Sequence, residues 1–308
     1  MSASSPPSAP EVSVIMANYN KGKFISAAIQ SVLEQTFAGV ELVIVDDAST
    51  DQSVVAAAEY ARAHSDRVRL ITFDQHRGPA AARNAGILGS RGDVICFLDS
   101  DDVYSPSKVE QQLRALREEQ KPVVVYCDWW RMDENGDTLS PGKRERLRKS
   151  GHIFSDAMCM VFGFSTMFMV RKEVLKAVGL YDESLIWAED YDLVLKLARD
   201  YDFKYVQEKL YGYRTHPQNT RNMMSRKERL YFEGLVTERH YLSGKGLLDR
   251  GARAKVVSIM MRYFAITGQR RKMLKYSFSS PGAFKSMVSS FVSFREIQPA
   301  EPLPAESR

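Results

Sequence analysis

Three carboxylates stand at the end of a short apolar run, and they are the clearest chemical signal in this chain. Residues 94–98 are all apolar, as in a strand buried on both faces of a parallel sheet, and Asp99, Asp101 and Asp102 follow directly. Because side chains alternate along a strand, Asp99 and Asp101 should project the same way. Carboxylates this close repel each other. A Mg²⁺ or Mn²⁺ ion, which prefers oxygen ligands and shares them with substrate phosphates, would relieve that repulsion.

A solvated acidic turn is the alternative explanation, since Asp and Ser are common turn residues. Two further polar clusters make a functional site the better interpretation. Asp46 and Asp47 follow a second apolar run, and Asn18, Tyr19 and Asn20 follow a third. In open parallel sheets, ligands bind outside the carboxyl ends of the strands. We therefore expect the three clusters to meet on one edge of a sheet.

The elements that must position these clusters alternate between strand and helix over the first 130 residues. Strands are predicted at 12–17, 41–45, 68–73, 94–98 and 123–129. Helices are predicted at 22–36, from an N-cap at Ser49 to about His64, from Gly78-Pro79, and from a cap at Ser105-Pro106 to about Glu119. This order favours an α/β fold with a mostly parallel sheet flanked by helices.

Glycine-rich phosphate loops are missing after the first strand, where Asn18-Tyr19-Asn20-Lys21 stands instead. Neither the dinucleotide-binding fingerprint nor a Walker-type loop is found there. The sequence therefore argues against a dehydrogenase and against a P-loop ATPase.

The second half of the chain is less regular. After an irregular stretch at 130–163, a strand is expected at 164–170 and a helix from Glu189 to about Arg199. From about Met223 the pattern is helical, with an amphipathic stripe at Phe284, Met287, Val288, Phe291 and Val292. The Ser/Pro/Ala-rich residues 1–10 and the tail 297–308 are expected to be disordered.

Six motifs occur in order: 12–20, 45–51, 82–86, 98–102, 187–190 and 213–216. In this order and spacing the chain resembles the family 2 glycosyltransferases, inverting enzymes with the GT-A fold. The resemblance covers about residues 11–222. It implies a catalytic domain over 11–222, with a nucleotide-binding part at about 11–130 and an acceptor part at about 131–222. A helical region at 223–296 resembles nothing that we can assign.

The resemblance implies a nucleotide-diphosphate sugar as donor, with UDP the expected nucleotide. Tyr19 would stack on the base, Asp47 would accept a hydrogen bond from it, and the backbone carbonyl of Ala17 would lie beside them. Asn18, Arg83 and Asp99 complete the nucleotide-binding set, with Asp99 nearer the ribose.

The same resemblance implies a divalent metal, Mg²⁺ or Mn²⁺, with Asp101 as its main ligand and Asp99 as a second. Asp190 matches the catalytic base, and a carboxylate within reach of the acceptor hydroxyl suits that role. The remaining site residues would contact the sugar, the diphosphate or the acceptor: Asp102, Trp187, Glu189, Arg214 and His216.

Several of these residues have simpler explanations. Glu189 sits where acids favour a helix start, and Arg83 could be a charge on an exposed helix face. Trp187 could be a core residue or a platform for a sugar ring. His216 is as compatible with an ordinary loop as with a phosphate contact. His64, His76, His152 and His240 are expected on the surface.

Composition indicates the class of protein and the compartment to expect. With 308 residues, 44% of them hydrophobic, the chain suits a soluble globular protein, and no apolar run is long enough for a membrane span. Residues 1–10 do not resemble a signal peptide. Cys96, Cys127 and Cys159 lack metal or redox spacing, which suits a reducing cytoplasm.

Charge is unevenly distributed. Residues 245–295 hold eleven Lys or Arg against one acid, Asp249, whereas the whole chain carries only +5. This basic segment either packs with its charges solvated or contacts an anionic membrane at the inner face of the cell, where lipid-linked acceptors reside. A nucleic-acid partner is not expected.

The predicted function is sugar transfer to an acceptor hydroxyl in cell-surface polysaccharide or glycolipid synthesis. Two alternatives stay open on the sequence: a sugar-nucleotide nucleotidyltransferase, which should carry a Gly-rich basic loop after its first strand, and a non-catalytic carbohydrate-binding or membrane scaffold, which should have lost the carboxylates.

Overall fold

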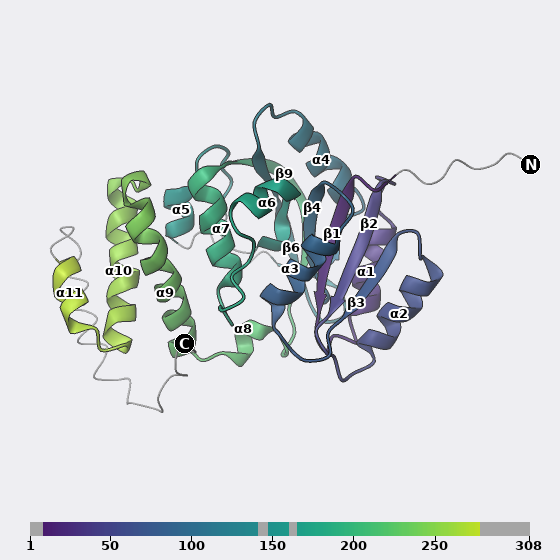
Figure 1. Ribbon diagram of the computed structural model, residues 1–308, viewed down its shortest axis with the longest axis horizontal. Coiled ribbons are helices and arrows are strands. Elements are labelled where there is room, and N and C mark those ends of the chain that lie inside the picture. Colours follow the sequence, from purple (N-terminus) through teal and green to yellow (C-terminus); the bar gives the residue numbers. More distant parts are fainter. Residues whose placement is uncertain (1–8, 141–146, 160–164, 278–308) are drawn as a thin grey trace, which may run out of the picture. The chain divides into compact units, whose positions relative to one another are not determined.

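The computed structural model describes residues 9–140, 147–159 and 165–277. Within the chain, two compact units separate at Met224 and Ser225. The first unit holds one mixed sheet with the strand order β3-β2-β1-β4-β8-β6-β9-β5, and β7 pairs with β6 (Figure 1). The domain boundaries that the sequence suggests, including those of the terminal tails, remain predictions.

Four parallel strands form the half of the sheet that carries the polar clusters. They are β1 (Val12–Asn18), β2 (Val40–Asp46), β3 (Val68–Thr72) and β4 (Val94–Asp99). Between them run α1 (Ile25–Leu33), α2 (Ser53–Ala63) and α3 (Pro79–Gly89). Asn18 pairs with Asp46, and Ala17 pairs with Asp99. All three strand ends therefore lie at one edge, as the sequence predicts.

The other half of the sheet departs from a parallel arrangement. β8 (Phe168–Arg171) lies antiparallel between β4 and β6 (Val123–Met132), while β9 (Asp202–Arg214) runs parallel to β6. Short strands β5 (Val103–Tyr104) and β7 (Thr138–Leu139) pair antiparallel with β9 and β6. The helices of this half are α4 (Lys108–Arg117), α5 (Phe154–Met158), α6 (Lys172–Ala177), α7 (Glu189–Asp200) and α8 (Thr220–Met223).

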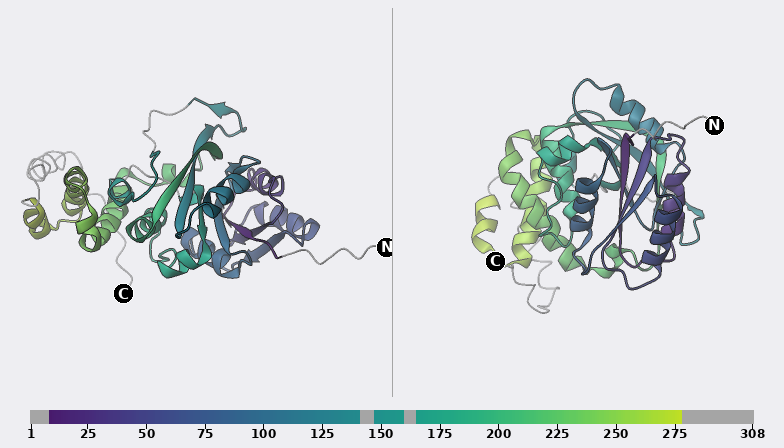
Figure 2. Two further views of the ribbon diagram at one scale, coloured as in Figure 1. Left: turned by 90° about the horizontal axis from the view of Figure 1, so that it is seen from above. Right: turned by 45° about the vertical axis from the view of Figure 1, so that its right-hand side comes forward.

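Helices cover both faces of the parallel strands (Figure 2). Ile25, Ile29 and Val32 of α1 join one core with alternate residues of β1 such as Val14. On the opposite face α3 lies so close to β1 that a Cβ added at Gly86 would stand 2.4 Å from Ile15 Cγ2. The glycine thus permits the close approach that positions the rest of α3 against the sheet.

Some local predictions are wrong. α2 begins after Gln52, not Ser49, because the Ser49 hydroxyl accepts a hydrogen bond from the backbone N–H of Asn20 instead of capping a helix. α4 has Ser107 as its N-cap residue, two positions later than predicted. The strand expected from residue 164 starts at Phe168, after a 3₁₀ turn at Ser165–Met167.

The second unit contains α9 (Arg226–Gly244), α10 (Arg250–Ile266) and α11 (Arg270–Ser277). α9 starts with a capping box between Ser225 and Glu228. A Cβ at Gly234 would stand 2.2 Å from Tyr263 Cβ, so this glycine lets α9 and α10 pack closely. The predicted stripe at 284–292 lies outside the described residues. None of the helices in the described ranges is both long and apolar enough to cross a membrane.

Candidate active site

A buried amide ties the first two strand ends together. Asn18 Nδ2 donates to Asp46 Oδ1 at 2.6 Å and to Ser53 Oγ at 2.9 Å. Through these bonds Asn18 fixes the strand ends, while its Oδ1 has no hydrogen-bond partner among the described residues; a nucleotide contact by Asn18 stays a prediction.

Asp47, the next acid along β2, is buried and held by backbone donors. The N–H groups of Arg77 and Gly78 donate to its two carboxylate oxygens at 2.7 and 2.8 Å. His76 Nδ1 lies 2.9 Å from Asp47 Oδ2, and its ring lies 4.2 Å, centroid to centroid, from that of Tyr19. Tyr19 is 42% exposed, so one side of this cluster is open to solvent.

Arg83 of α3 joins the acidic strand end to the start of α7. Its guanidinium contacts Asp99 Oδ1 at 2.9 Å and Glu189 Oε1 at 2.8 Å, and the arginine is buried. This contradicts the alternative of an exposed helix charge. Glu189 is likewise more than a helix-start acid, because its carboxylate faces a buried cation.

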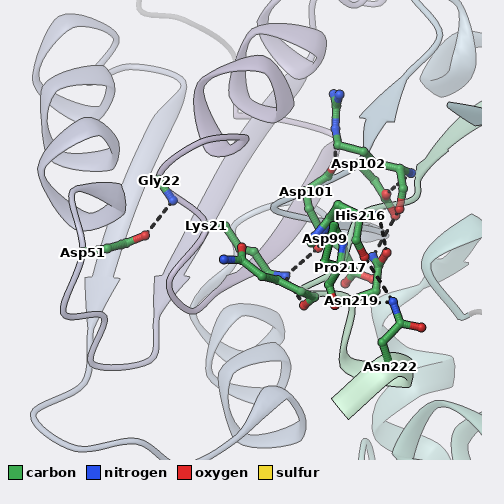
Figure 3. Close-up of polar contacts among 12 residues, drawn as sticks. Lys21, Gly22, Asp51, Asp99, Asp101, Asp102, His216, Pro217, Asn219 and Asn222 are labelled. Carbon is green, nitrogen blue, oxygen red and sulfur yellow. Dashed lines mark hydrogen bonds and ion pairs between the residues drawn. The ribbon is translucent and has the colours of Figure 1, made fainter. Parts of the chain in front are cut away.

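Asp101 faces two basic side chains from distant parts of the chain (Figure 3). Lys21 Nζ lies 2.8 Å and His216 Nε2 lies 3.0 Å from the same oxygen, Oδ2. Burial of the carboxyl opposes its ionisation, but the hydrogen bond with His216 and the charge of Lys21 outweigh it, and the pKa of Asp101 lies below its ordinary value.

Asp102, one residue later, has a different environment. Its carboxylate accepts hydrogen bonds from the backbone N–H of Arg214 at 2.7 Å and from the Tyr211 hydroxyl at 2.6 Å. Burial, together with the charges of Asp101 and Asp99, raises the pKa of Asp102 well above its ordinary value. Asp102 thus anchors β9 against the acidic strand end.

Arg214 also connects segments of backbone. Its Nε donates to the carbonyl of Asp101 at 2.8 Å, and its Nη1 donates to the carbonyl of Glu134 at 3.0 Å. Its guanidinium is buried and lies over the Phe24 ring. Arg214 therefore positions the Asp101 loop in this structure.

His216 is held by a tight turn. Asn219 Oδ1 accepts from the His216 N–H at 2.7 Å, and Asn222 Nδ2 donates to the His216 carbonyl at 3.2 Å (Figure 3). The imidazole is buried against Phe24, with Nε2 towards Asp101 and no hydrogen-bond partner for Nδ1 among the described residues. The structure thus supports a role in the site for His216 over an ordinary loop histidine.

Asp190 lies in the first turn of α7 and is partly buried. Its carboxylate accepts a hydrogen bond from the N–H of the next residue, Tyr191, at 2.7 Å. Burial, followed by the charge of Glu189, raises the pKa of Asp190 to about 7. A carboxyl with this pKa is suited to exchange protons near neutral pH. Trp187, three residues earlier, is partly buried.

Backbone strain gathers beside the same side chains. Asn20, Ala48 and Ala188 have positive φ angles of 52°, 59° and 64°. They lie next to Tyr19, Asp47 and Glu189. Non-glycine residues in this conformation persist when the surroundings fix them, and they cluster at functional sites.

A metal site is not preformed. In the ranges that the structure describes, no group of three or more His, Cys, Asp or Glu side chains is arranged to hold an ion. The donors nevertheless suit one: Asp99 and Asp101 supply the oxygens that Mg²⁺ and Mn²⁺ prefer, and His216 adds a nitrogen. The repulsion that raises the pKa of Asp102 is also what a divalent cation would relieve.

Two residues of this cluster are absent from the predicted site set. Lys21 could have been noticed because it follows directly on the polar end of β1. His76 belongs to the loop after β3, which opens at the same sheet edge; it is exposed, as expected, and in addition contacts Asp47. His240, also expected on the surface, is buried inside the second unit.

Comparison with known proteins is consistent with this geometry. The family model for glycosyl transferase family 2 matches residues 13–179, a range that ends before Asp190 and His216. An uncharacterized glycosyltransferase of Rickettsia typhi is 30% identical over 218 residues, which cover 69% of this chain and 66% of the relative. The chain thus spans just under two thirds of that relative's length.

Solved structures show the same fold at low identity. S. aureus TarS in complex with UDP-GlcNAc has a TM-score of 0.63 at 17% identity, covering 93% of this chain and 90% of TarS. The mannosyltransferase PcManGT from Pyrobaculum calidifontis, in complex with GDP-Man and Mn²⁺, has a TM-score of 0.59 at 16% identity, covering 94% and 87%. The chain belongs to glycosyl transferase family 2 and has the GT-A fold.

Proposed function

We propose that this protein transfers a sugar from a nucleotide-diphosphate sugar, with UDP as the expected nucleotide, to an acceptor hydroxyl with inversion at the anomeric carbon. Family membership supports the class of reaction, and the two structural neighbours carry UDP-GlcNAc and GDP-Man. The observation that carries the proposal is the position of Asp190 in the acidic cluster: the buried Arg83 pairs with Asp99 at the sheet edge and with Glu189, the residue before Asp190, at 2.9 and 2.8 Å. Burial and the charge of Glu189, which raise the pKa of Asp190, agree with a role in proton transfer.

The nucleotide binds, in this proposal, at the ends of β1 and β2. The exposed Tyr19 ring stacks on the base, and Asp47 accepts its N–H. Asp47 accepts one backbone N–H on each oxygen, and an ionised carboxylate has about four lone-pair positions, so capacity for the base remains. The carbonyl of Ala17 lies on the same strand end, and Asn18 keeps that end in place.

A divalent ion would be held by Asp101, with Asp99 and His216 as further ligands. When bound, it would stabilise the charge that builds on the leaving diphosphate. Arg83 orients Asp99, and Asp102 with Arg214 orients the loop that carries Asp101. Only Asp101, Asp99 and His216 therefore need to contact the ion.

Asp190 accepts the proton of the acceptor hydroxyl as that oxygen attacks the sugar. A carboxylate is too weak a base to ionise a hydroxyl beforehand, so proton transfer accompanies bond formation. Glu189 and Trp187 flank the base and are proposed to line the space for the donor sugar and the acceptor.

Replacement of Asp190 by Asn tests the assignment. We expect Asp190→Asn to lower turnover by about 10²-fold or more, because an amide cannot accept the proton. Asp200→Asn is the matched control, since Asp200 ends the same helix and, among the described residues, pairs only with Arg199 at the surface. Nucleotide-diphosphate release is measured, with thermal melting to confirm folding. Full activity in a folded Asp190→Asn protein would contradict the role.

We also propose that the acceptor belongs to a cell-surface polysaccharide or glycolipid and that α11 contacts an anionic membrane. Arg270, Arg271 and Lys275 are exposed on this helix beside Leu274, which is 57% exposed. Such a surface combines electrostatic attraction to acidic lipids with apolar contact.

Vesicle flotation of the full chain tests the membrane contact. Arg270→Glu with Arg271→Glu should abolish binding to vesicles of phosphatidylglycerol and phosphatidylcholine, since each basic residue near the surface contributes about 1 kcal/mol. Arg62→Glu with Lys121→Glu, an equal charge change at exposed positions of the first unit, is the control. Equal flotation of both double variants would contradict contact through α11.

A further inference from the structure

Lys21 occupies an unusual position for a loop lysine. Its ammonium lies 2.8 Å from Asp101 Oδ2 and 3.3 Å from the carbonyl of Gln218. The side chain is only 16% exposed. Lys21 therefore reaches from the loop after β1 into the acidic cluster and also contacts the turn that carries His216 (Figure 3).

The backbone around Lys21 is fixed on both sides. Before it, Asn20 accepts the N–H of Thr50 at 2.8 Å and adopts a positive φ angle. After it, the N–H of Gly22 donates to Asp51 Oδ2 at 2.8 Å. The carbonyl of Lys21 itself accepts from the Phe24 N–H at 2.8 Å. The long side chain can thus change its rotamer while the loop stays in place.

The oxygen that Lys21 contacts belongs to the residue that offers the best metal ligand. An ammonium group is a compact point charge on a flexible stem, so it can compensate a carboxylate and can also leave it. A divalent ion bound to Asp101 and an ammonium group at 2.8 Å from the same oxygen would repel each other strongly in this buried setting. The two cations therefore compete for one position.

We propose that Lys21 is an internal counter-ion that neutralises Asp101 in the metal-free protein and that the divalent ion must displace. The inference rests on the proposed function in that it takes Asp101 as a metal ligand. It assigns to Lys21 a specific effect: this side chain lowers the affinity of the free enzyme for the metal. Lys21 acts on the metal through Asp101 and is thus a positioning residue.

A direct titration of Mn²⁺ into the full chain without nucleotide tests the proposal. Free aquo-Mn²⁺ is quantified by electron paramagnetic resonance, so no enzymatic activity is needed. Lys21→Gln should bind Mn²⁺ about tenfold more tightly than the wild type, within the usual range of coupling between two sites. The same variant should melt at a lower temperature without metal and gain more from added Mn²⁺, because it has lost its internal cation.

Lys23→Gln is the matched control. It removes the same charge from the same loop, but Lys23 is exposed and pairs with Glu134 at the surface. We expect its Mn²⁺ affinity to stay within twofold of the wild type. A second control is the Lys21→Gln, Asp101→Asn double variant, which should lose Mn²⁺ binding because the effect of Lys21 requires the Asp101 carboxylate.

Mn²⁺ affinity in Lys21→Gln that equals or falls below that of the wild type overturns the proposal, and so does an equal gain in Lys23→Gln. Absence of Mn²⁺ binding by every variant at millimolar concentrations also overturns it. Failure of the proposed function is read separately, from the turnover of Asp190→Asn, so the two outcomes are distinguishable.

Discussion

Asp47 and Asp101 follow β2 and β4, the two parallel strands on either side of β1, yet different kinds of group hold their carboxylates. Asp47 accepts hydrogen bonds from the backbone N–H groups of Arg77 and Gly78 in a single loop. Asp101 is met by the side chains of Lys21 and His216, which come from segments far away in the sequence. The Asp47 carboxylate thus has two main-chain donors as well as His76 Nδ1, which lies 2.9 Å from Oδ2. Among the described residues, the Asp101 carboxylate contacts side chains only.

This difference fits the two roles proposed for the same edge of the sheet: Asp47 would bind the nucleotide and Asp101 would bind the metal. The backbone donors of Asp47 can move only with the loop before α3, so the proposed nucleotide half would be preorganised. A lysine side chain can leave Asp101 by a change of rotamer, so the proposed metal half could accept another cation. In the proposed function, the Asp47 carboxylate therefore makes a permanent contact and the Asp101 carboxylate an exchangeable one.

Of the substitutions that test this comparison, replacement of Asp101 should have the largest effect on turnover. We expect Asp101→Asn to lower turnover by about 10² to 10³-fold, as for the loss of one stabilising group opposite a developing charge. Nucleotide affinity measured in the presence of a chelator should stay within twofold of the wild type, because Asp101 acts through the metal. A large loss of affinity under chelation would show that Asp101 contacts the nucleotide directly.

The matched substitution at the proposed nucleotide site, Asp47→Asn, should have a smaller effect, and it should lower nucleotide affinity whether or not metal is present. Nucleotide affinity is expected to fall by about ten- to a hundredfold with or without metal, since a hydrogen bond to a charged group contributes about 1.5–3 kcal/mol. Calorimetric titration with uridine diphosphate, once in Mn²⁺ and once in chelator, measures the affinity with and without metal. A loss of nucleotide affinity that occurs only in the presence of Mn²⁺ would contradict the distinction between Asp47 and Asp101.

Local signals in the sequence were enough to predict the sheet edge. The apolar runs ending at Asn18, Asp46 and Asp99 are confirmed as β1, β2 and β4, and Gly78-Pro79 is confirmed as the start of α3. These predictions succeed because a buried strand needs a continuous apolar run and because proline fixes the first turn of a helix.

Contacts between distant segments were not predictable in this way. The pairing of Lys21 with Asp101 depends on how β1, β4 and the turn after β9 meet in space. Ser49 has the residue type of a helix cap, but the strained turn at Asn20 uses its hydroxyl instead. The antiparallel insertion of β8 between β4 and β6 left no local mark, because a short apolar strand reads alike in either direction.

The pH dependence of kcat/KM tests the central assignment most directly. Burial and the neighbouring Glu189 charge raise the pKa of Asp190 to about 7, so the proposed base would be protonated, and unable to accept a proton, below that pH. We predict that kcat/KM with saturating Mn²⁺ rises about tenfold per pH unit and levels off above a midpoint near pH 7. The residual activity of Asp190→Asn should lack this rise. A wild-type profile that is flat from pH 5.5 to 8 would contradict Asp190 as the base.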